Sequence, residues 1–370
     1  MRTTLAGKPP LEEDPDPADT SLVNDTVNDP ADRSTLPPPP NPAGRGPSPL
    51  VAKVTGVDKR FGAVRALEGL NIDVPKAKIT VLLGPNGAGK TTAIRMITGA
   101  MGPDAGAVEV FGADPCGRQG EEIRRRCGVV SAKPSLYDRL SGLDNLRYAA
   151  ELYDLGRGTA TDRRIVDAAE QFGIAEALAQ RVGGYSTGMK TRLALARSIL
   201  HDPDLLLLDE PTSGLDPESA QAVLGMVREM TTRGRSVLMC THLLLEAEGL
   251  ADEVVIIQDG TSLVWGEPAT LALRYWPRPE VTITARRGAK LERLRRFPEV
   301  AEVSISGDSA RLVLNDRRAI SRIIHRLAMD GVELLAVEPY RVSLEDLYFA
   351  VRREHRLGIE GLGADDPGRP

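Results

Sequence analysis

Cysteines, aromatic residues and long apolar runs are scarce in this chain of 370 residues. It holds three cysteines and only 4% Phe, Trp and Tyr. Cys116, Cys127 and Cys240 form no closely spaced pair, so we expect neither a disulfide framework nor a zinc or redox motif, and a reducing compartment is favoured. The longest aliphatic runs, at 79–83 and 205–208, are far shorter than the roughly 20 residues that cross a bilayer. We therefore expect no membrane span in the chain itself.

Charge of neither sign dominates, because 47 basic residues face 52 acidic ones and the net charge is −5. Proteins that bind nucleic acid through its phosphates need a basic face, and this composition shows no basic excess. We therefore expect no nucleic-acid partner. The length allows two or three domains at about 150 residues each, and 41% hydrophobic residues suffice for an ordinary globular core.

Residues 1–50 differ in composition from the rest of the chain. They hold 12 of the 27 prolines and eight acidic residues against four basic ones, with almost no periodic apolar pattern. Such a segment cannot bury enough apolar surface to offset the entropy of ordering it. We predict a disordered acidic tail, and favour a solvated extension without function over a docking motif.

The following part of the chain predicts an α/β fold. Residues 51–57 alternate like a strand, and 71–74 form another short one. Four solidly apolar runs indicate strands covered on both faces, at 78–83, 205–208, 237–240 and 254–258. Helical stretches precede the last three runs, so we expect a doubly wound, mostly parallel sheet. Residues 136–182 are helical in pattern, with Ser141 as an N-cap and Asp144 as its acidic partner, which predicts a helical insertion.

After residue 275 the pattern changes to the order β-α-β-β-α-β, which predicts a small ferredoxin-like α+β domain. Its elements are expected at 280–285, 289–297, 300–306, 310–314, 318–329 and 332–338, and an amphipathic helix at 343–352 follows. The resulting division is a tail at 1–50, a first domain at 51–275 with its helical part at about 133–185, an accessory domain at 276–352 and a flexible tail at 353–370.

A phosphate-binding pattern, G-x-x-x-x-G-K-[ST], is matched in full between an apolar strand and a helix predicted at 92–98. It comprises Gly84, Pro85, Asn86, Gly87, Ala88, Gly89, Lys90 and Thr91, and Thr92 follows. We expect Gly84, Gly87 and Gly89 to let the backbone adopt positive φ and wrap its N–H groups around a β-phosphate. Lys90 is expected on the β- and γ-phosphates and Thr91 on Mg²⁺. A glycine-rich turn with an incidental lysine is the alternative.

Asp209 and Glu210 follow the run at 205–208, at the carboxyl end where doubly wound sheets bind ligands. Asp209 is expected to hold hydrated Mg²⁺, and Glu210 to orient and polarise the water that attacks the γ-phosphorus. An Asp-Glu pair after a strand is by itself usually a turn. The phosphate loop earlier in the chain favours the functional interpretation.

Residues 185–189, Tyr-Ser-Thr-Gly-Met, precede a helix predicted at 190–200. Ser186 and the amide of Gly188 lie at its N-terminus, a ready anion site, although Ser186 taken alone is better explained as an N-cap. With this stretch the chain, from about 51 to 268, resembles the nucleotide-binding subunits of ATP-binding cassette (ABC) transporters, in the signature variant common among exporter ATPases. The resemblance implies that Ser186, Gly188 and Met189 cap the γ-phosphate of ATP held by an opposite subunit, with two subunits enclosing two ATPs.

The same resemblance implies an antiparallel β-subdomain and three further residue roles. Phe61 is the aromatic ring that stacks on adenine, with a core residue as the alternative. Asp216, in the segment 213–216, belongs to the loop by which the two sites communicate. His242, after the strand at 237–240, is the switch histidine that contacts the γ-phosphate and helps hold the water of Glu210.

Ala132 departs from the family's pattern, which places a glutamine at this position. That glutamine reaches the Mg²⁺ and the attacking water and links the site to the membrane partner, and an alanine does neither. Lys133 or Ser131 are candidates to replace it in part. Loss of one positioning ligand need not abolish turnover, because Glu210, Lys90 and His242 remain.

The resemblance implies an ATPase subunit, with ATP and Mg²⁺ as cofactors, that powers export of a drug, antibiotic, lipid or similar compound. It implies a separate transmembrane permease, a second nucleotide-binding subunit in a homodimer, and a peripheral location on the cytoplasmic face of the cell membrane. The C-terminal domain resembles, less specifically, the accessory domain of such exporters. Two alternatives are a soluble ABC-type ATPase acting on ribosomes or DNA and a weakly hydrolysing, nucleotide-gated binding module.

Overall fold

The computed structural model describes residues 49–286, 288–316 and 318–363. The tail predicted at 1–50 lies outside the described residues, except for Pro49 and Leu50. Leu50 already belongs to the first strand, β1 (Leu50–Phe61). The first strand therefore begins one residue before the domain boundary expected from composition.

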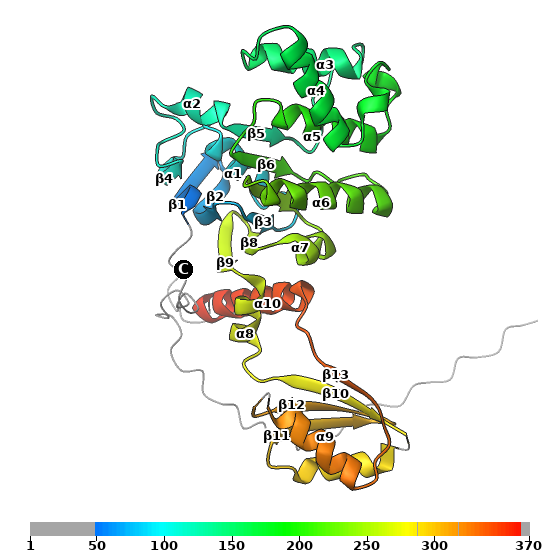
Figure 1. Cartoon of the computed structure of the whole chain (residues 1–370). Helices are drawn as coiled ribbons and strands as arrows, with labels where there is room; N and C mark the ends of the chain where they lie inside the picture. The colour runs from blue at the N-terminus through cyan, green and yellow to red at the C-terminus, as the bar shows by residue number, and fades with distance from the viewer. Residues whose placement is uncertain (1–48, 287, 317, 364–370) are drawn as a thin grey trace, which may run out of the picture. The chain divides into compact units, whose positions relative to one another are not determined.

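A three-stranded antiparallel sheet forms the predicted β-subdomain. Its order is β2-β1-β4, with β2 at Val64–Pro75 and β4 at Ala105–Val110 (Figure 1). Both β1 and β2 are longer than the strands expected at 51–57 and 71–74. They pair along most of their length as a hairpin, so backbone hydrogen bonds extend each strand beyond its apolar stretch.

The central sheet has six strands in the order β5-β6-β7-β3-β8-β9. They are β5 (Cys127–Val130), β6 (Leu205–Asp209), β7 (Ser236–Thr241), β3 (Ile79–Leu83), β8 (Glu253–Gln258) and β9 (Thr261–Gly266). The first five are parallel, and β9 pairs with β8 in the antiparallel sense. The predicted doubly wound, mostly parallel sheet is confirmed.

Both faces of the central sheet are covered, as the solid apolar runs predict. Successive side chains of a strand point to opposite faces, and in β6 Leu206 and Leu208 belong to one core cluster while Leu205 and Leu207 belong to the other. The first cluster includes side chains of α5 (Thr187–Ile199), α6 (Pro217–Thr232) and α7 (Leu244–Leu250). The second joins the central sheet to α1 (Lys90–Ile97) and the three-stranded sheet, so α1 lies between two sheets.

The helical insertion is present. It contains α3 (Gly142–Leu152) and α4 (Thr159–Gln171), which pack on each other (Figure 1), and two short 3-10 helices, η1 (Ala175–Ala177) and η2 (Val182–Gly184). Ser141 caps α3, because its Oγ accepts a hydrogen bond from the amide of Asp144 at 3.0 Å. A further helix, α2 (Gly120–Arg125), precedes β5.

The C-terminal region forms a separate four-stranded antiparallel sheet in the order β11-β12-β10-β13. Its elements are β10 (Glu280–Ala285), η3 (Gly288–Arg296), β11 (Val300–Ser306), β12 (Ser309–Leu314), α9 (Ala319–Met329) and β13 (Leu334–Pro339). This is the split βαβ arrangement that the sequence predicts. The helix expected at 289–297 is a 3-10 helix, which is a correction in helix type.

The last helix differs from its prediction in length and in packing. α10 (Leu344–Gly363) continues beyond residue 352, where the flexible tail was expected to begin. Its buried residues Leu344, Leu347 and Val351 belong to the core beneath the central sheet, and α10 contacts α7, β9 and α8 (Pro268–Tyr275). The sequence placed this helix in the accessory domain, because its apolar face carries no information about its partner. In the described part of the chain, no helix is both long and apolar enough to cross a membrane.

The packing of α10 predicts that truncating Leu347, which is 1% exposed, destabilises the first domain. We expect Leu347→Ala to lower the free energy of unfolding by about 2–5 kcal/mol, because it removes buried methyl groups and leaves a cavity. Urea unfolding monitored by circular dichroism measures this. Leu335→Ala is the matched control, because Leu335 is 61% exposed. Equal stability of the two variants would contradict the assigned packing.

The buried strands also predict how the three thiols react. Cys116 is exposed, whereas Cys127 and Cys240 are buried in β5 and β7. Burial raises the pKa of the Cys127 thiol to about 12 and that of Cys240 well above its ordinary value. Since the thiolate is the reactive form, a disulfide reagent at pH 8 should titrate one thiol in the native protein and all three after unfolding. Cys116→Ser should abolish the native reaction; fast labelling of more than one thiol argues against this core.

Candidate functional site

Three neighbouring strands bring the phosphate loop and the predicted catalytic and metal-binding residues to one edge of the central sheet. β7 pairs in parallel with β3 on one side and with β6 on the other. The carboxyl ends of parallel strands lie at the same edge. The phosphate loop follows β3, Asp209 ends β6 and Glu210 follows it, and His242 follows β7. Strand order thus assembles residues that are far apart in the sequence.

The glycines of the phosphate loop have two different roles. Gly87 and Gly89 have φ values of 84° and 102°, the left-handed region that favours glycine, as expected. Gly84 does not have positive φ, so that part of the prediction is wrong. Its requirement is close packing, because a Cβ at Gly84 would lie 2.3 Å from the carbonyl oxygen of Ile257. A Cβ at Gly87 would meet nothing within 4 Å, so the loop is open on that side.

Lys90 carries the charge of the loop and is buried, with 5% of its side chain exposed. Its Nζ donates hydrogen bonds to the carbonyl oxygens of Gly84 at 2.7 Å and Pro85 at 3.0 Å. It also lies 3.2 Å from Oε1 of Glu210. The ammonium group is therefore held where the loop and the end of β6 meet.

One carboxylate oxygen of Glu210 contacts both Lys90 and His242. The same Oε1 that faces Lys90 also lies 3.2 Å from Nδ1 of His242. The backbone of Glu210 has φ of 49°, the left-handed region that costs a residue with a side chain of order 1–3 kcal/mol and is concentrated at functional sites. Its amide donates to the carbonyl of Cys240 at 2.9 Å, which fixes this turn against the end of β7.

Thr91 and Asp209 meet beside this group. The hydroxyl of Thr91 donates to Oδ2 of Asp209 at 2.7 Å, and Asp209 is buried. Hydroxyl and carboxylate oxygens are hard ligands of the kind that Mg²⁺ uses, and Mg²⁺ in nucleotide sites is held by one or two such residues together with phosphates and water. Across the described residues no cluster of three or more His, Cys, Asp and Glu side chains converges. The donor set therefore fits a magnesium ion that depends on a phosphate ligand.

Phe61 ends β1, and 47% of it is exposed to solvent. The alternative that Phe61 is a core residue is therefore wrong. An exposed aromatic ring is free to stack on a planar group. Of the remaining loop residues, Ala88 is buried and its carbonyl accepts from the amide of Gly260 at 3.1 Å, which attaches the loop to the β8–β9 turn.

The start of α5 forms a second group, away from the phosphate loop. Ser186 caps the helix, and its Oγ accepts from the amide of Met189 at 3.2 Å, which confirms the N-cap interpretation. Gly188 lies near the start of α6, since a Cβ there would be 3.6 Å from Oγ of Ser219. Asp216 caps α6 by accepting from the amide of Ser219 at 2.9 Å, and this bond lowers the pKa of Asp216. Within the described residues, no hydrogen bond or ion pair joins these residues to the phosphate loop.

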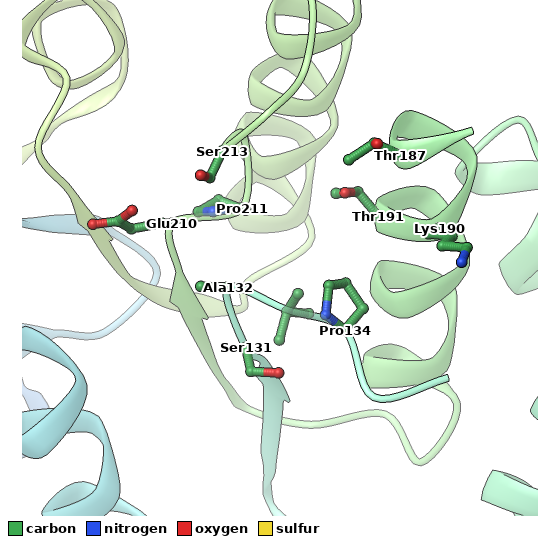
Figure 2. A pocket seen from close by; sticks show the side chains of 10 residues that line it. Ser131, Ala132, Pro134, Thr187, Lys190, Thr191, Glu210, Pro211 and Ser213 are labelled. Carbon is green, nitrogen blue, oxygen red and sulfur yellow. The ribbon is translucent and has the colours of Figure 1, made fainter. Parts of the chain in front are cut away.

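A small cavity of about 80 Å³ is lined by Glu210 and by residues of α5, and Ala132 lies on its wall (Figure 2). Other wall residues come from α5, Thr187 and Thr191 among them, and from the turn that begins with Glu210. Figure 2 shows the Glu210 carboxylate pointing away from Ala132. The hydroxyl of Ser131 donates to the carbonyl of Lys133 at 2.9 Å, so its hydrogen bond is made within the same loop. Ala132 thus leaves open space beside Glu210.

Three buried polar residues near the site were missed by the sequence analysis. They are Thr212, Thr241 and Glu246. Glu246 accepts hydrogen bonds from both threonine hydroxyls. The only sequence signal was an acidic residue beside Ala247 on the buried face of a short helix, and such a signal does not identify a partner.

Comparison with known proteins agrees with this geometry. The family model described as ABC transporter matches residues 67–213. The daunorubicin resistance ATP-binding protein DrrA3 of Streptomyces coeruleorubidus is 32% identical over 82% of this chain and 96% of its own length. The Nod factor export ATP-binding protein I of a Rhizobium species is 33% identical over 81% of this chain and 96% of its own length.

A solved structure of an ATP-binding subunit of an ABC transporter supports the same assignment. It is 30% identical, has a TM-score of 0.55, and matches 61% of this chain and 93% of its own. The two relatives match over nearly their whole length and indicate the same family as this structure. Membership of that family explains both the phosphate loop and the residues at the neighbouring strand ends. The chain belongs to the ABC transporter family, as one of its ATP-binding subunits, an ATPase coupled to transport.

Proposed function

We propose that this chain hydrolyses Mg²⁺-ATP to drive export through a separate membrane permease, working as a homodimer on the cytoplasmic face of the cell membrane. The observation that carries the proposal is the convergence of Lys90, Glu210 and His242, with Thr91 and Asp209 beside them. A nucleotide-binding subunit of this family works with a membrane permease and in pairs. The names of the relatives, which include drug resistance and Nod factor export proteins, favour export.

The phosphate loop would bind the triphosphate of ATP. Backbone N–H groups at the start of α1, together with the positive end of the helix dipole, favour an anion there. The residues concerned are Gly84, Pro85, Asn86, Gly87, Ala88, Gly89, Lys90, Thr91 and Thr92. Lys90 would bind the β- and γ-phosphates, and the exposed ring of Phe61 would stack on the adenine.

Thr91 and Asp209 would hold Mg²⁺, through the hydroxyl and the carboxylate that now hydrogen-bond to each other. When bound, the ion neutralises negative charge on the phosphates. Asp209 is buried at the end of β6 and cannot move far, so the metal position would be set by the sheet rather than by a flexible loop.

Glu210 would act as the general base that orients and deprotonates the attacking water. Its Oε1 is shared by Lys90 and His242, and Lys90 is the group that a phosphate would attract. Transfer of the ammonium from the carboxylate to the phosphates would leave Glu210 free to accept a proton from water. His242 would stay beside Glu210 and contact the γ-phosphate.

The start of α5 would complete the site of a second copy. Ser186, Gly188 and Met189 lie at a helix N-terminus, where an anion is stabilised. They make no bond to the phosphate loop of their own chain among the residues described, which supports action across a dimer interface. Asp216, at the N-terminus of α6 close to Gly188, would then respond to the occupancy of both sites.

Turnover is expected to depend on Glu210, His242 and Lys90 without help from the position of Ala132. Neither an asparagine nor a glutamine is among the residues that line the cavity beside Ala132. Slow hydrolysis by the chain alone is therefore compatible with the proposal. A chain that binds ATP and never releases phosphate, with or without its permease, would instead be a nucleotide-gated binding module.

The test of this proposal is Glu210→Gln. We expect phosphate release by the purified protein to fall by about 10²- to 10⁴-fold, because the amide cannot accept the proton of the water. ATP binding, measured by equilibrium dialysis, should stay within about threefold of the wild type, since the phosphate loop is intact. Glu248→Gln makes the same chemical change on an exposed residue of α7 and should have no effect. Undiminished hydrolysis by Glu210→Gln would disprove the assignment of the base.

A further inference from the structure

Three buried polar side chains form a cluster directly behind the proposed base and histidine. Thr212, Thr241 and Glu246 are 4%, 1% and 9% exposed. They come from three places: Thr212 from the turn after β6, Thr241 from the last position of β7, and Glu246 from α7. Each is close in sequence to a site residue, because Thr212 is two positions after Glu210 and Thr241 directly precedes His242.

Glu246 is the centre of the cluster. Its Oε2 accepts a hydrogen bond from Oγ1 of Thr212 at 2.7 Å and from Oγ1 of Thr241 at 3.1 Å. Oγ1 of Thr241 in turn accepts from the amide of Leu243 at 3.0 Å. One carboxylate oxygen therefore connects the turn that contains Glu210 to the turn that contains His242.

A carboxylate at this position is costly unless it has a purpose. Its neighbours on the inner face of α7, Ala247 and Leu250, belong to the hydrophobic core. Burying a carboxylate among apolar groups costs free energy even when it is hydrogen-bonded, and an apolar residue of similar volume is often as stable or more so. A buried polar contact of this kind is better explained by the specific arrangement that it enforces than by stability.

We propose that Glu246 is a positioning residue, which holds the turn of Glu210 and the turn of His242 at a fixed spacing so that they move as one unit. The inference rests on the proposed function, because it assumes that these two residues carry out the chemistry. His242 and Lys90 both face a single oxygen of Glu210 at 3.2 Å, so small displacements of either turn separate them. The hydrogen bond from Thr212 to Glu246 also connects the segment from Glu210 to Asp216 with the turn of His242.

The main test compares Glu246→Leu with Glu246→Gln in the full-length protein. The leucine removes the acceptor of the two threonine O–H groups, whereas the glutamine retains a carbonyl oxygen that accepts from both. We expect Glu246→Leu to lower kcat for ATP by about 10- to 100-fold, as displacements of about 1 Å do in other enzymes, with KM and the Kd for ATP within about threefold. Glu246→Gln should restore kcat to within about threefold of the wild type.

Threonine variants keep the test decisive if Glu246→Leu does not fold. Thr212→Val and Thr241→Val each remove one bond to Glu246 with little change in volume, and each should lower kcat. The matched control is Thr161→Val, because the buried Thr161 hydroxyl donates to the carbonyl of Leu155 at 3.0 Å in the helical insertion. If Thr161→Val lowers kcat as much as the other two, the effect is one of general stability and the proposal is wrong.

A double variant separates positioning from a merely structural role. If Glu246 acts through the spacing of His242 and Glu210, then Glu246→Leu should have little further effect on kcat in a His242→Ala background. Losses that multiply fully would show that Glu246 acts elsewhere and would overturn the proposal, as would a kcat of Glu246→Leu within twofold of the wild type.

Hydrogen exchange tests the same inference without relying on turnover. In Glu246→Leu the amides of 210–216 and 241–244 should exchange faster together, and in Glu246→Gln they should not. If the wild type hydrolyses no ATP but this paired change occurs, the proposed function fails while the coupling by Glu246 stands. If neither segment changes, or if one changes alone, the coupling is disproved whatever the activity.

Discussion

The site depends on one constraint of topology, the position of β7 between β3 and β6. Because all three strands are parallel, the loops that follow them meet at one edge of the sheet. Each strand is completely buried, and alternate side chains enter two different packed cores, so a shift in register would misplace side chains in both cores. The relative positions of Lys90, Glu210 and His242 follow from this rigid arrangement.

Charge balance at the site is local and depends on a single carboxylate oxygen. Lys90 and His242 both face Oε1 of Glu210. The ammonium group of Lys90 also donates hydrogen bonds to the loop carbonyls of Gly84 and Pro85. A group that competes for Lys90 therefore changes the surroundings of Glu210 directly. The left-handed backbone of Glu210 shows that the turn is held in this conformation by its neighbours.

The helix α7 connects the site to the C-terminal part of the chain. It begins two residues after His242, carries Glu246 on its inner side, and packs against α10. α10 is further attached by a hydrogen bond from Nε of Arg352 to Oε1 of Gln258, at the end of β8. The helix α7 thus carries Glu246 of the polar cluster, and its buried residues Ala247 and Leu250 share a hydrophobic core with Leu347 of α10.

The sequence by itself determined the phosphate loop, the buried strands and the order of elements in the accessory domain, because each has a local pattern of glycines, apolar residues or alternation. Positive φ at Gly87 and the helix cap at Ser141 were likewise predictable from the local sequence. Only the tertiary structure decided that Gly84 packs on Ile257, that Glu246 joins two turns, and that α10 covers the first domain. These features depend on which distant residues meet, and a periodic pattern indicates that a face is buried without indicating what covers it.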